Sequence, residues 1–358
     1  MFEKSPRLIV GGEFTFSPAI VFSRQYNQFS SYGSQLTEYK RHYTFGAYYS
    51  FKAIIGHLKL GQRDSVLLPA YLCPSMIIPF REAGIKYDFF KMKEGLVPDL
   101  EDIDRKLNKD VRAILFVDYF GVSQKQEVAP ILDVLKANKT ATIQDTVQSW
   151  LDNENDLYGD YCVNSVRKYA PFEASVLFAR QEMSFSCKHG SMSRFLRHKR
   201  WAQLLRYYHL KNGWFSANAF LKHIELSNSE YHQEGIAEMP WLNSWLLDRI
   251  DFKALGKQRR RVYQGLLENL SLKTLIKADI GEAVPLGVAV YLNDRDAKKI
   301  ALHQRNIHCP LHWRLSEEID RREHDFCWDI EQHALTLPVN VSATSVNEYS
   351  KILREVLA

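Results

Sequence analysis

Short apolar segments alternate with helical patterns along residues 46–180 of this 358-residue chain. Such alternation predicts a mainly parallel sheet covered by helices, and the near-continuous apolar character fits strands buried on both faces. The expected strands are residues 65–69, 86–90, 111–117, 140–145 and 174–178, and apolar residues recur at helical spacing over 51–60, 74–83, 100–107 and 127–138. In a sheet of this kind we expect ligands at the carboxyl ends of the strands.

The rest of the chain has a different pattern. Helical spacing dominates residues 193–208, 214–224 and 241–270, and mixed elements follow, with strands at 287–292 and 335–338 and helices at 295–306 and 346–356. The fold class predicted is therefore α/β. A large domain over residues 1–245 carries the helix-covered sheet and an N-terminal arm (1–45), and a smaller α+β domain spans 246–358.

Composition narrows the class of protein. The charged share of 25%, the hydrophobic share of 46% and the net charge of +5 are ordinary for a globular protein and do not indicate a nucleic-acid partner. No apolar run approaches the roughly 20 residues that span a bilayer. The five cysteines are scattered, so we expect reduced thiols in a cytoplasmic protein, and the twelve histidines show no metal-ligand spacing.

One pair of residues suggests a chemistry. Asp145 ends an apolar segment, and Lys168 follows it after a second short apolar stretch. A carboxylate in such a place can hold a pyridine nitrogen protonated, and a lysine amine can form a Schiff base, as pyridoxal phosphate chemistry requires. Taken alone, Lys168 also fits a solvated surface lysine and Asp145 a strand-end cap.

Further segments resemble a known family. In chain order they are residues 11–16, residues 60–75 (LGQRDSVLLPAYLCPS, against LGxxxGDEVLLPAYTCPS), 117–121, 143–148 (IQDTVQ, against IEDAAQ), 159–160 (GD) and 335–339 (LTLPV, against LSLPV). Together they resemble the sugar aminotransferases of the DegT/DnrJ/EryC1/StrS family over nearly the whole chain. The resemblance implies fold type I of the pyridoxal phosphate enzymes, with this cofactor.

The resemblance also implies roles for individual residues. Lys168 corresponds to the lysine that holds the cofactor covalently and transfers protons, and Asp145 to the aspartate that pairs with the pyridine nitrogen. Gln148 faces the phenolate region, and Ser165 corresponds to a serine that helps to hold the phosphate.

The phosphate itself is expected at the start of a helix near Gly46, Ala47 and Tyr48, where unpaired amides and the helix dipole favour an anion. His312 and Trp313 stand where family members have a histidine–aromatic pair near the substrate. A lone histidine such as His312 is also often structural.

Four departures from the family pattern stand out. The serine-to-lysine spacing is three residues rather than five, as in a shorter variant from a divergent branch, and residues 172–175 (FEAS) replace that branch's Pro-Asp-Gly-Gly. The aromatic residue that stacks on the cofactor falls at Cys73, for which Tyr71 could substitute. An Asn/Arg element contributed by the partner subunit is not recognisable around residues 237–240.

A basic stretch also needs an interpretation. Residues 183–224 hold eight Lys and Arg and no Asp or Glu, interleaved with aromatic residues. The stretch could attract a nucleotide-sugar pyrophosphate, an acidic polymer or a membrane surface, or it could be a solvated basic helix with its aromatic residues packed inward.

The function predicted is a cytoplasmic, homodimeric aminotransferase that uses pyridoxal phosphate. Its substrates would be a keto-sugar, nucleotide-linked, and an amino-acid donor such as glutamate, with no nucleic-acid partner and no membrane insertion. One alternative is a keto-sugar dehydratase, which Lys168 disfavours because dehydratases of this family lack the lysine. Another is a non-catalytic homologue that binds a sugar or a partner. A nicotinamide enzyme is set aside because no GxGxxG follows an expected strand.

Overall fold

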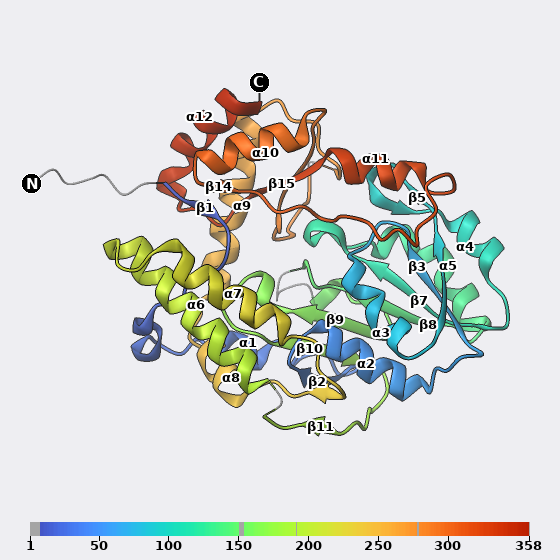
Figure 1. Cartoon of the computed structure of the whole chain (residues 1–358). Coiled ribbons are helices and arrows are strands. Elements are labelled where there is room, and N and C mark those ends of the chain that lie inside the picture. The colour runs from blue at the N-terminus through green and yellow to red at the C-terminus, as the bar shows by residue number, and fades with distance from the viewer. Residues whose placement is uncertain (1–7, 150–153, 191, 278, 358) are drawn as a thin grey trace, which may run out of the picture. The chain divides into compact units, whose positions relative to one another are not determined.

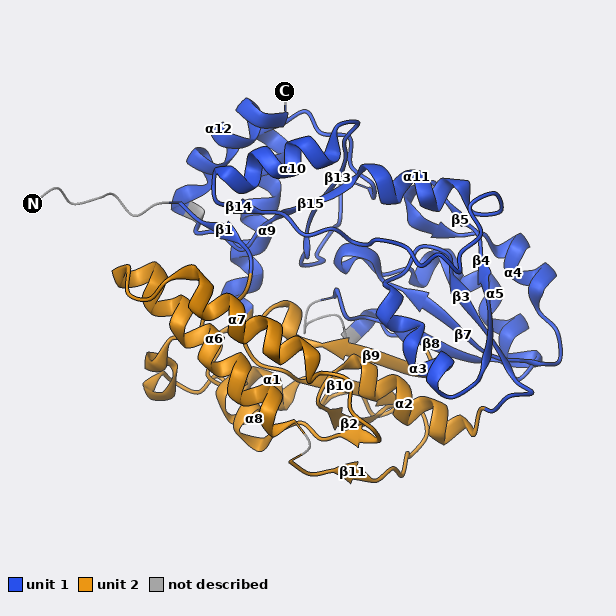
Figure 2. Ribbon diagram, in the orientation of Figure 1, with its two compact units in different colours: residues 1–12, 61–158, 253–358 blue, residues 13–60, 159–252 orange. Residues whose placement is uncertain are grey.

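The computed structural model describes residues 8–149, 154–190, 192–277 and 279–357 (Figure 1). Two compact units share the chain (Figure 2): unit 1 comprises residues 1–12, 61–158 and 253–358, and unit 2 comprises residues 13–60 and 159–252. Each unit therefore contains part of the predicted large domain, and the predicted domain boundary near residue 245 stays a prediction. Residues 1–7 of the expected N-terminal arm lie outside the described residues.

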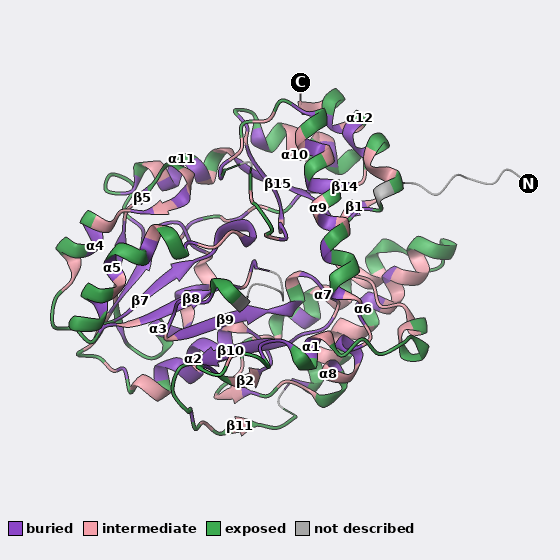
Figure 3. Ribbon diagram, turned by 180° about the vertical axis from the view of Figure 1, so that it is seen from behind, coloured by how far each residue is buried: buried purple, intermediate pink, exposed green. Residues whose placement is uncertain are grey.

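Unit 1 contains four parallel strands. They are β3 (Ser65–Pro69), β4 (Lys86–Phe90), β7 (Val111–Val117) and β8 (Ala141–Asp145), in the order β4-β3-β7-β8. The helices α3 (Ile78–Glu82), α4 (Leu100–Lys106) and α5 (Lys125–Ala137) connect them. Because Val117 pairs with Asp145, strands β7 and β8 end side by side, and both are largely buried (Figure 3).

The C-terminal part of unit 1 has its own core. Strand β13 (Gly287–Tyr291) pairs antiparallel with β15 (Ala334–Pro338), and β1 (Val10–Gly11) pairs parallel with β14 (Ile307–His308). The helices are α9 (Phe252–Asn269), α10 (Arg295–Gln304), α11 (Asp325–His333) and α12 (Val346–Leu357). Helices α9, α10 and α12 pack with the strands around one cluster that includes Leu266, Val288, Leu302, Leu337 and Leu353. Helix α11 was not predicted from the sequence.

Unit 2 contains three antiparallel strands and the helix α2 (Ala47–Leu58). Strand β10 (Ser175–Ala179) lies between β2 (Lys40–Thr44) and β9 (Tyr161–Ser165). All residues of β9 and β10 are buried, and α2 packs against both strands. Strand β2 had no counterpart among the expected strands.

Helices make up the remainder of unit 2. They are α1 (Gln28–Ser31), the pair α6 (Ser193–Asn212) and α7 (Ala217–Ser229), which pack against each other, and α8 (Trp241–Leu247). Short two-stranded ladders join β11 (Cys187–Lys188) to β12 (Ile236–Ala237) here, and β5 (Met92–Lys93) to β6 (Val97–Pro98) in unit 1. No helix in the described ranges is long and apolar enough to cross a membrane.

One helix prediction was wrong in its extent. Residues 241–270 form two helices, α8 and α9, rather than one. The chain leaves the helical path at Asp248, whose backbone carbonyl accepts hydrogen bonds from Tyr26 N (2.6 Å) and Asn27 N (3.1 Å). The Asp248 carboxylate also accepts one from Ser30 N at 2.9 Å. Contacts with a distant segment thus end a helix that local spacing would continue.

Candidate active site

Asp145 lies at the carboxyl end of β8, where unit 1 collects polar side chains. It is buried, and its Oδ1 accepts a hydrogen bond from Val147 N at 2.8 Å. The bond belongs to the turn that follows the strand, in which Ser149 N donates to Thr146 O. The Val147 amide, two residues further on, therefore helps to orient the carboxylate.

Gln148 is held by the neighbouring strand end. Its Oε1 accepts a hydrogen bond from Phe120 N at 2.5 Å. Its Nε2 is buried and has no hydrogen-bond partner in the part of the chain that the structure describes. A buried donor without a partner is costly, so Gln148 presents a donor that a ligand acceptor such as a phenolate oxygen would satisfy.

A second carboxylate, Asp118, follows β7 directly and was missed as a site candidate. It is fully buried and accepts hydrogen bonds from Gln124 N (3.1 Å) and Gln144 Nε2 (2.8 Å). Burial, together with the nearby charge of Asp145, raises the pKa of Asp118 to about 8 against the lowering effect of these two bonds. The sequence signal was present, because Asp118 ends an apolar strand as Asp145 does.

Unit 1 also brings together Tyr71, His312 and Trp313, three of the predicted residues. The Tyr71 hydroxyl donates to the backbone oxygen of His312, and its ring centroid lies 5.7 Å from that of Trp313. His312 Nδ1 lies 2.8 Å from Thr336 Oγ1, on β15. Tyr119 adds a hydrogen bond to the Tyr71 backbone oxygen at 2.5 Å.

This packing limits what Tyr71 can offer a ligand. Tyr71 has no exposed surface, and its ring packs against both Tyr119 and Trp313. Cys73 is partly exposed, with its Sγ 2.9 Å from Ser75 Oγ. A stacking role for either residue stays a prediction.

In unit 2 the start of α2 has features that suit an anion. Gly46 is the N-cap residue and has no side chain with which to cap the helix, and the first-turn amides of Ala47 and Tyr48 point out of the helix end. A β-carbon at Gly46 would lie only 2.3 Å from the Tyr231 hydroxyl oxygen. Only glycine therefore fits at this position as the side chains stand.

Ser165 ends β9 close to this helix start. It pairs with Ser175, whose hydroxyl lies 2.9 Å from that of Ser50 in the first turn of α2. The Ser165 hydroxyl is buried and has no hydrogen-bond partner among the residues described. An unsatisfied hydroxyl near the N-terminus of a helix suits an anionic ligand.

Lys168 lies three residues further on, in the short 3₁₀ turn Val166–Lys168, and is partly buried. Sequence reasoning missed Arg167, which lies within this turn, and Tyr231, which contacts Arg167. The guanidinium carbon of Arg167 lies 5.0 Å from the centroid of the Tyr231 ring. Burial raises the pKa of Tyr231, while Arg167 lowers it and Glu173 raises it, so these three side chains lie within electrostatic reach of one another.

Arg167 carried a signal in the sequence, because it adjoins the predicted lysine. Tyr231 carried none, since it comes from the segment after α7. Unit 2 thus gathers a helix N-terminus, a buried hydroxyl, a tyrosine and an arginine around the turn that bears Lys168. Such a set can hold a phosphate group beside an amine.

The basic stretch of residues 183–224 lies mainly on α6 and α7. Some of its side chains agree with the anion-attracting interpretation and others with the packed one. Arg200 and Arg206 turn inward, whereas Arg194 and Arg197 are exposed. The aromatic residues also divide, because Phe195 is buried while about half of the Trp201 surface is exposed.

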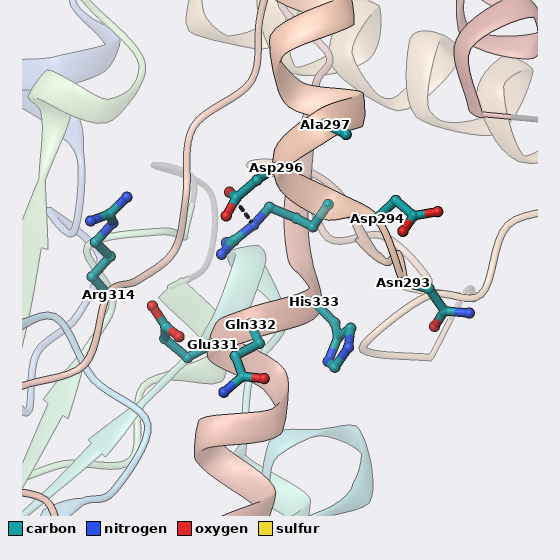
Figure 4. A pocket seen from close by; sticks show the side chains of 9 residues that line it. Asn293, Asp294, Asp296, Ala297, Arg314, Glu331, Gln332 and His333 are labelled. Atoms are coloured by element: carbon teal, nitrogen blue, oxygen red, sulfur yellow. Dashed lines mark ion pairs between the residues drawn. The ribbon is translucent and has the colours of Figure 1, made fainter.

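A polar hollow of about 580 Å³ lies in unit 1 at the start of α10 (Figure 4). Arg295, Asp296, Arg314 and Glu331 give it charges of both signs, and Arg295 Nε lies 2.8 Å from Asp296 Oδ1. Arg314 follows Trp313 directly, but none of the predicted site residues is among the described residues that line this hollow. It is therefore separate from the predicted cofactor residues.

The sequence matches no family model and no curated protein. Solved structures do match. A protein of Streptococcus pneumoniae assigned as a sugar aminotransferase, in its PMP form, has a TM-score of 0.68 at 13% identity, covering 97% of this chain and 93% of that one. A DegT DnrJ EryC1 StrS aminotransferase from Brucella abortus has a TM-score of 0.66 at 12% identity, covering 96% and 92%.

A third similar structure has a different activity. The GDP-4-keto-6-deoxy-D-mannose-3-dehydratase of E. coli, with bound hydrated PLP, has a TM-score of 0.65 at 14% identity and covers 98% of this chain and 100% of its own. At these identities the similarity establishes the fold. The chain has the fold type I architecture that the sequence predicted.

Proposed function

We propose that the chain is an aminotransferase that uses pyridoxal phosphate to aminate a keto-sugar, nucleotide-linked, with an amino-acid donor such as glutamate. The observation that carries the proposal is the anion site beside Lys168, where the unsatisfied Ser165 hydroxyl lies near the uncapped start of α2. The fold shared with aminotransferases supports it.

For each polar group of this cofactor, the described residues include suitable hydrogen-bond donors or acceptors. The start of α2, Ser165, Arg167 and Tyr231 would hold the phosphate. In unit 1, the unsatisfied Gln148 Nε2 would donate to the phenolate oxygen, and Asp145 would accept from the pyridine nitrogen.

When bound, pyridoxal phosphate supplies an electron sink that stabilises negative charge on a substrate carbon. Lys168 would bind it covalently through Nζ. When the substrate amine takes its place, the same Nζ would remove the proton from the substrate carbon and return a proton during the transfer. The Asp145 carboxylate would keep the ring nitrogen protonated throughout.

The proposal also covers the oligomeric state, the cellular location and the remaining residues of the site. A homodimer in the cytoplasm, with His312 and Trp313 near the sugar, follows from the family resemblance. Tyr71 or Cys73 would lie beside the cofactor ring. Ala47 and Tyr48 would contribute backbone amides to the phosphate.

The test is whether Lys168 binds the cofactor. Purified protein incubated with pyridoxal phosphate should be yellow, borohydride should bleach the visible absorption, and Lys168→Ala should lack it. Lys188→Ala, which removes a largely exposed lysine of the same unit, should stay yellow. A wild-type protein that remains colourless would overturn the proposal, and one that then still binds a nucleotide sugar would indicate a non-catalytic homologue.

Glutamate separates the two enzymatic functions. Transamination requires that glutamate alone convert the bound cofactor into its amine form, with loss of the visible absorption and release of 2-oxoglutarate. A keto-sugar dehydratase, the activity of the E. coli protein with the same fold, would instead release water from its sugar substrate. Lys168 favours transamination.

A further inference from the structure

The segment that follows Lys168 departs from the family pattern, and unit 2 holds it in an unusual way. Residues 171–173 (PFE) lie between β10 and the short turn Val166–Lys168, which we call the lysine turn. All three residues are largely or fully buried, including the carboxylate of Glu173. A buried acidic residue in a loop needs a partner, because an isolated buried charge is costly.

Arg200, from α6, is that partner and contacts the segment at three points. Its Nη1 donates to the Pro171 backbone oxygen at 2.7 Å. Its guanidinium carbon lies 4.6 Å from the centroid of the Phe172 ring, and its Nη2 lies 3.8 Å from Glu173 Oε2. One planar group thus binds a carbonyl, covers an aromatic ring and places its positive charge near a carboxylate.

Two buried amides complete the arrangement. Gln203 Nε2 donates to the same Pro171 oxygen at 2.7 Å, and Asn243 Nδ2, from α8, donates to the Glu173 backbone oxygen at 2.7 Å. Both amides also accept from Arg200, through Gln203 Oε1 and Asn243 Oδ1, at 2.7 Å each. Arg200 therefore binds the segment directly and also orients the two amides that bind it.

The held segment is tied to the lysine turn through the backbone. Ala174 O accepts a hydrogen bond from Val166 N at 3.0 Å, which closes the loop that contains Lys168. Within that loop, Tyr169 N and Ala170 N both donate to Val166 O. A shift of residues 171–174 would therefore shift Val166 and the turn that ends at Lys168.

We propose that Arg200 is a positioning residue that fixes the lysine turn through residues 171–174. The inference rests on the proposed function only in giving Lys168 its role. A lysine could not replace Arg200, because one ammonium cannot reach a carbonyl, two amides and a carboxylate in these directions and also cover a ring.

Two measurements on wild type and variants test the proposal, and the first needs no cofactor. Hydrogen exchange of the Val166 amide in cofactor-free protein should become about 10-fold faster or more in Arg200→Met, because the Ala174 carbonyl loses its fixed place. Asn243→Ala, on a different helix, should accelerate the same amide. Arg197→Met, which removes an exposed arginine of α6, should leave it unchanged.

The second measurement reports on Lys168 itself. With pyridoxal phosphate bound, Arg200→Met should shift the pH midpoint of the visible absorption change and lower kcat more than it changes KM. Arg200→Lys should give an intermediate shift. Glu173→Gln should have a smaller effect than Arg200→Met, since the two held carbonyls remain bound.

The outcomes separate this inference from the proposed function. If Arg200→Met lowers the melting temperature while the Val166 amide keeps wild-type protection, Arg200 only packs α6 and the inference is overturned. If the Val166 amide responds as expected but neither wild type nor any variant binds pyridoxal phosphate, the positioning role of Arg200 is supported and the proposed function fails. Should Arg200→Met fail to fold, Asn243→Ala decides between the same two results.

Discussion

The strand end in unit 1 and the lysine turn in unit 2 hold their key residues by different means. Asp145 is the last residue of a parallel ladder, and its carboxylate accepts a hydrogen bond from Val147 N, two residues away. Lys168 ends a turn whose flanking segment is held by Arg200 and Asn243, from two helices far along the chain. The comparison teaches that a backbone ladder fixes a site residue through many small contacts. In the lysine turn, by contrast, a few side chains hold the backbone in place.

The difference predicts where single substitutions act. At the strand end, a change to a side chain should leave the backbone in place and affect only what that side chain does to a ligand. In unit 2, one changed side chain should move the backbone that bears the lysine.

The largest effect is expected for Asp145→Asn. The asparagine Oδ1 can still accept from Val147 N, so the melting temperature should change little, but an amide cannot hold a ring nitrogen protonated. We expect the rate of the glutamate half-reaction to fall by about 100-fold or more, the scale of losing one preorganised electrostatic group. Single-turnover absorbance measures this rate.

A matched control for this prediction is Asp118→Asn, on the neighbouring strand end. It should retain at least a third of the wild-type rate, roughly within the spread of ordinary non-catalytic substitutions. If both variants lose the same activity, the two strand-end carboxylates act together and the role given to Asp145 alone is wrong.

A smaller effect is expected for Gly46→Ala. The new β-carbon would meet the Tyr231 hydroxyl at 2.3 Å, so the tyrosine must move away from the start of α2. We expect a loss of about 1–3 kcal/mol in the free energy of unfolding, typical of overpacking. Chemical denaturation measures this loss, and binding of pyridoxal phosphate should weaken with it.

The same helix provides the control. A β-carbon at Gly56, inside α2, would meet no atom within 4 Å. Gly56→Ala should therefore stabilise the protein, by about 0.5–1 kcal/mol, because alanine favours a helix interior over glycine. Equal losses at both positions would show that the close approach of Tyr231 does not decide the outcome at Gly46.

The smallest effect concerns pH. Burial raises the pKa of Asp118 to about 8, so the folded state binds its proton more tightly than the unfolded state does. Its contribution to stability is fully present below the ordinary aspartate pKa of about 4 and is lost as pH rises through about 8. Asp118→Asn should cost about 1 kcal/mol at pH 5 through one weakened hydrogen bond.

That variant should lose less stability than wild type between pH 5 and pH 9. Melting temperatures at the two pH values measure the difference. Parallel declines in the two proteins would show that Asp118 does not titrate in this range.

Much of the fold could be predicted because its signals are local. The strands at residues 65–69, 86–90 and 111–117 have the predicted bounds. The first and third are almost entirely buried and therefore read as near-continuous apolar runs, whereas the second is buried only at its last two residues. Strand β2 was missed because its sequence, KRHYT, is polar and only partly buried. The break between α8 and α9 was missed because Asp248 binds a segment more than 200 residues earlier in the chain.

The same reasoning applies to the site. Asp145 could be chosen from the sequence because it ends an apolar segment, Lys168 because it follows a second short one, and Ser165 because it corresponds to a serine of the family that the chain resembles. Arg200, Asn243 and Tyr231 could not, since their contacts arise only when α6, α8 and the segment after α7 pack beside the lysine turn. Neither helical spacing nor a motif marks a side chain whose role is to bind a distant carbonyl.

The uncapped start of α2 has a thermodynamic consequence. Serine, threonine, aspartate and asparagine are the side chains preferred for satisfying the first amides of a helix, at a gain of about 1 kcal/mol. Here Gly46 supplies no such group, so an anion arriving at this end would serve as the missing cap. Occupancy of the site and stability of unit 2 are then linked by mass action. The melting temperature should therefore rise with the concentration of any phosphate compound that binds at the helix start.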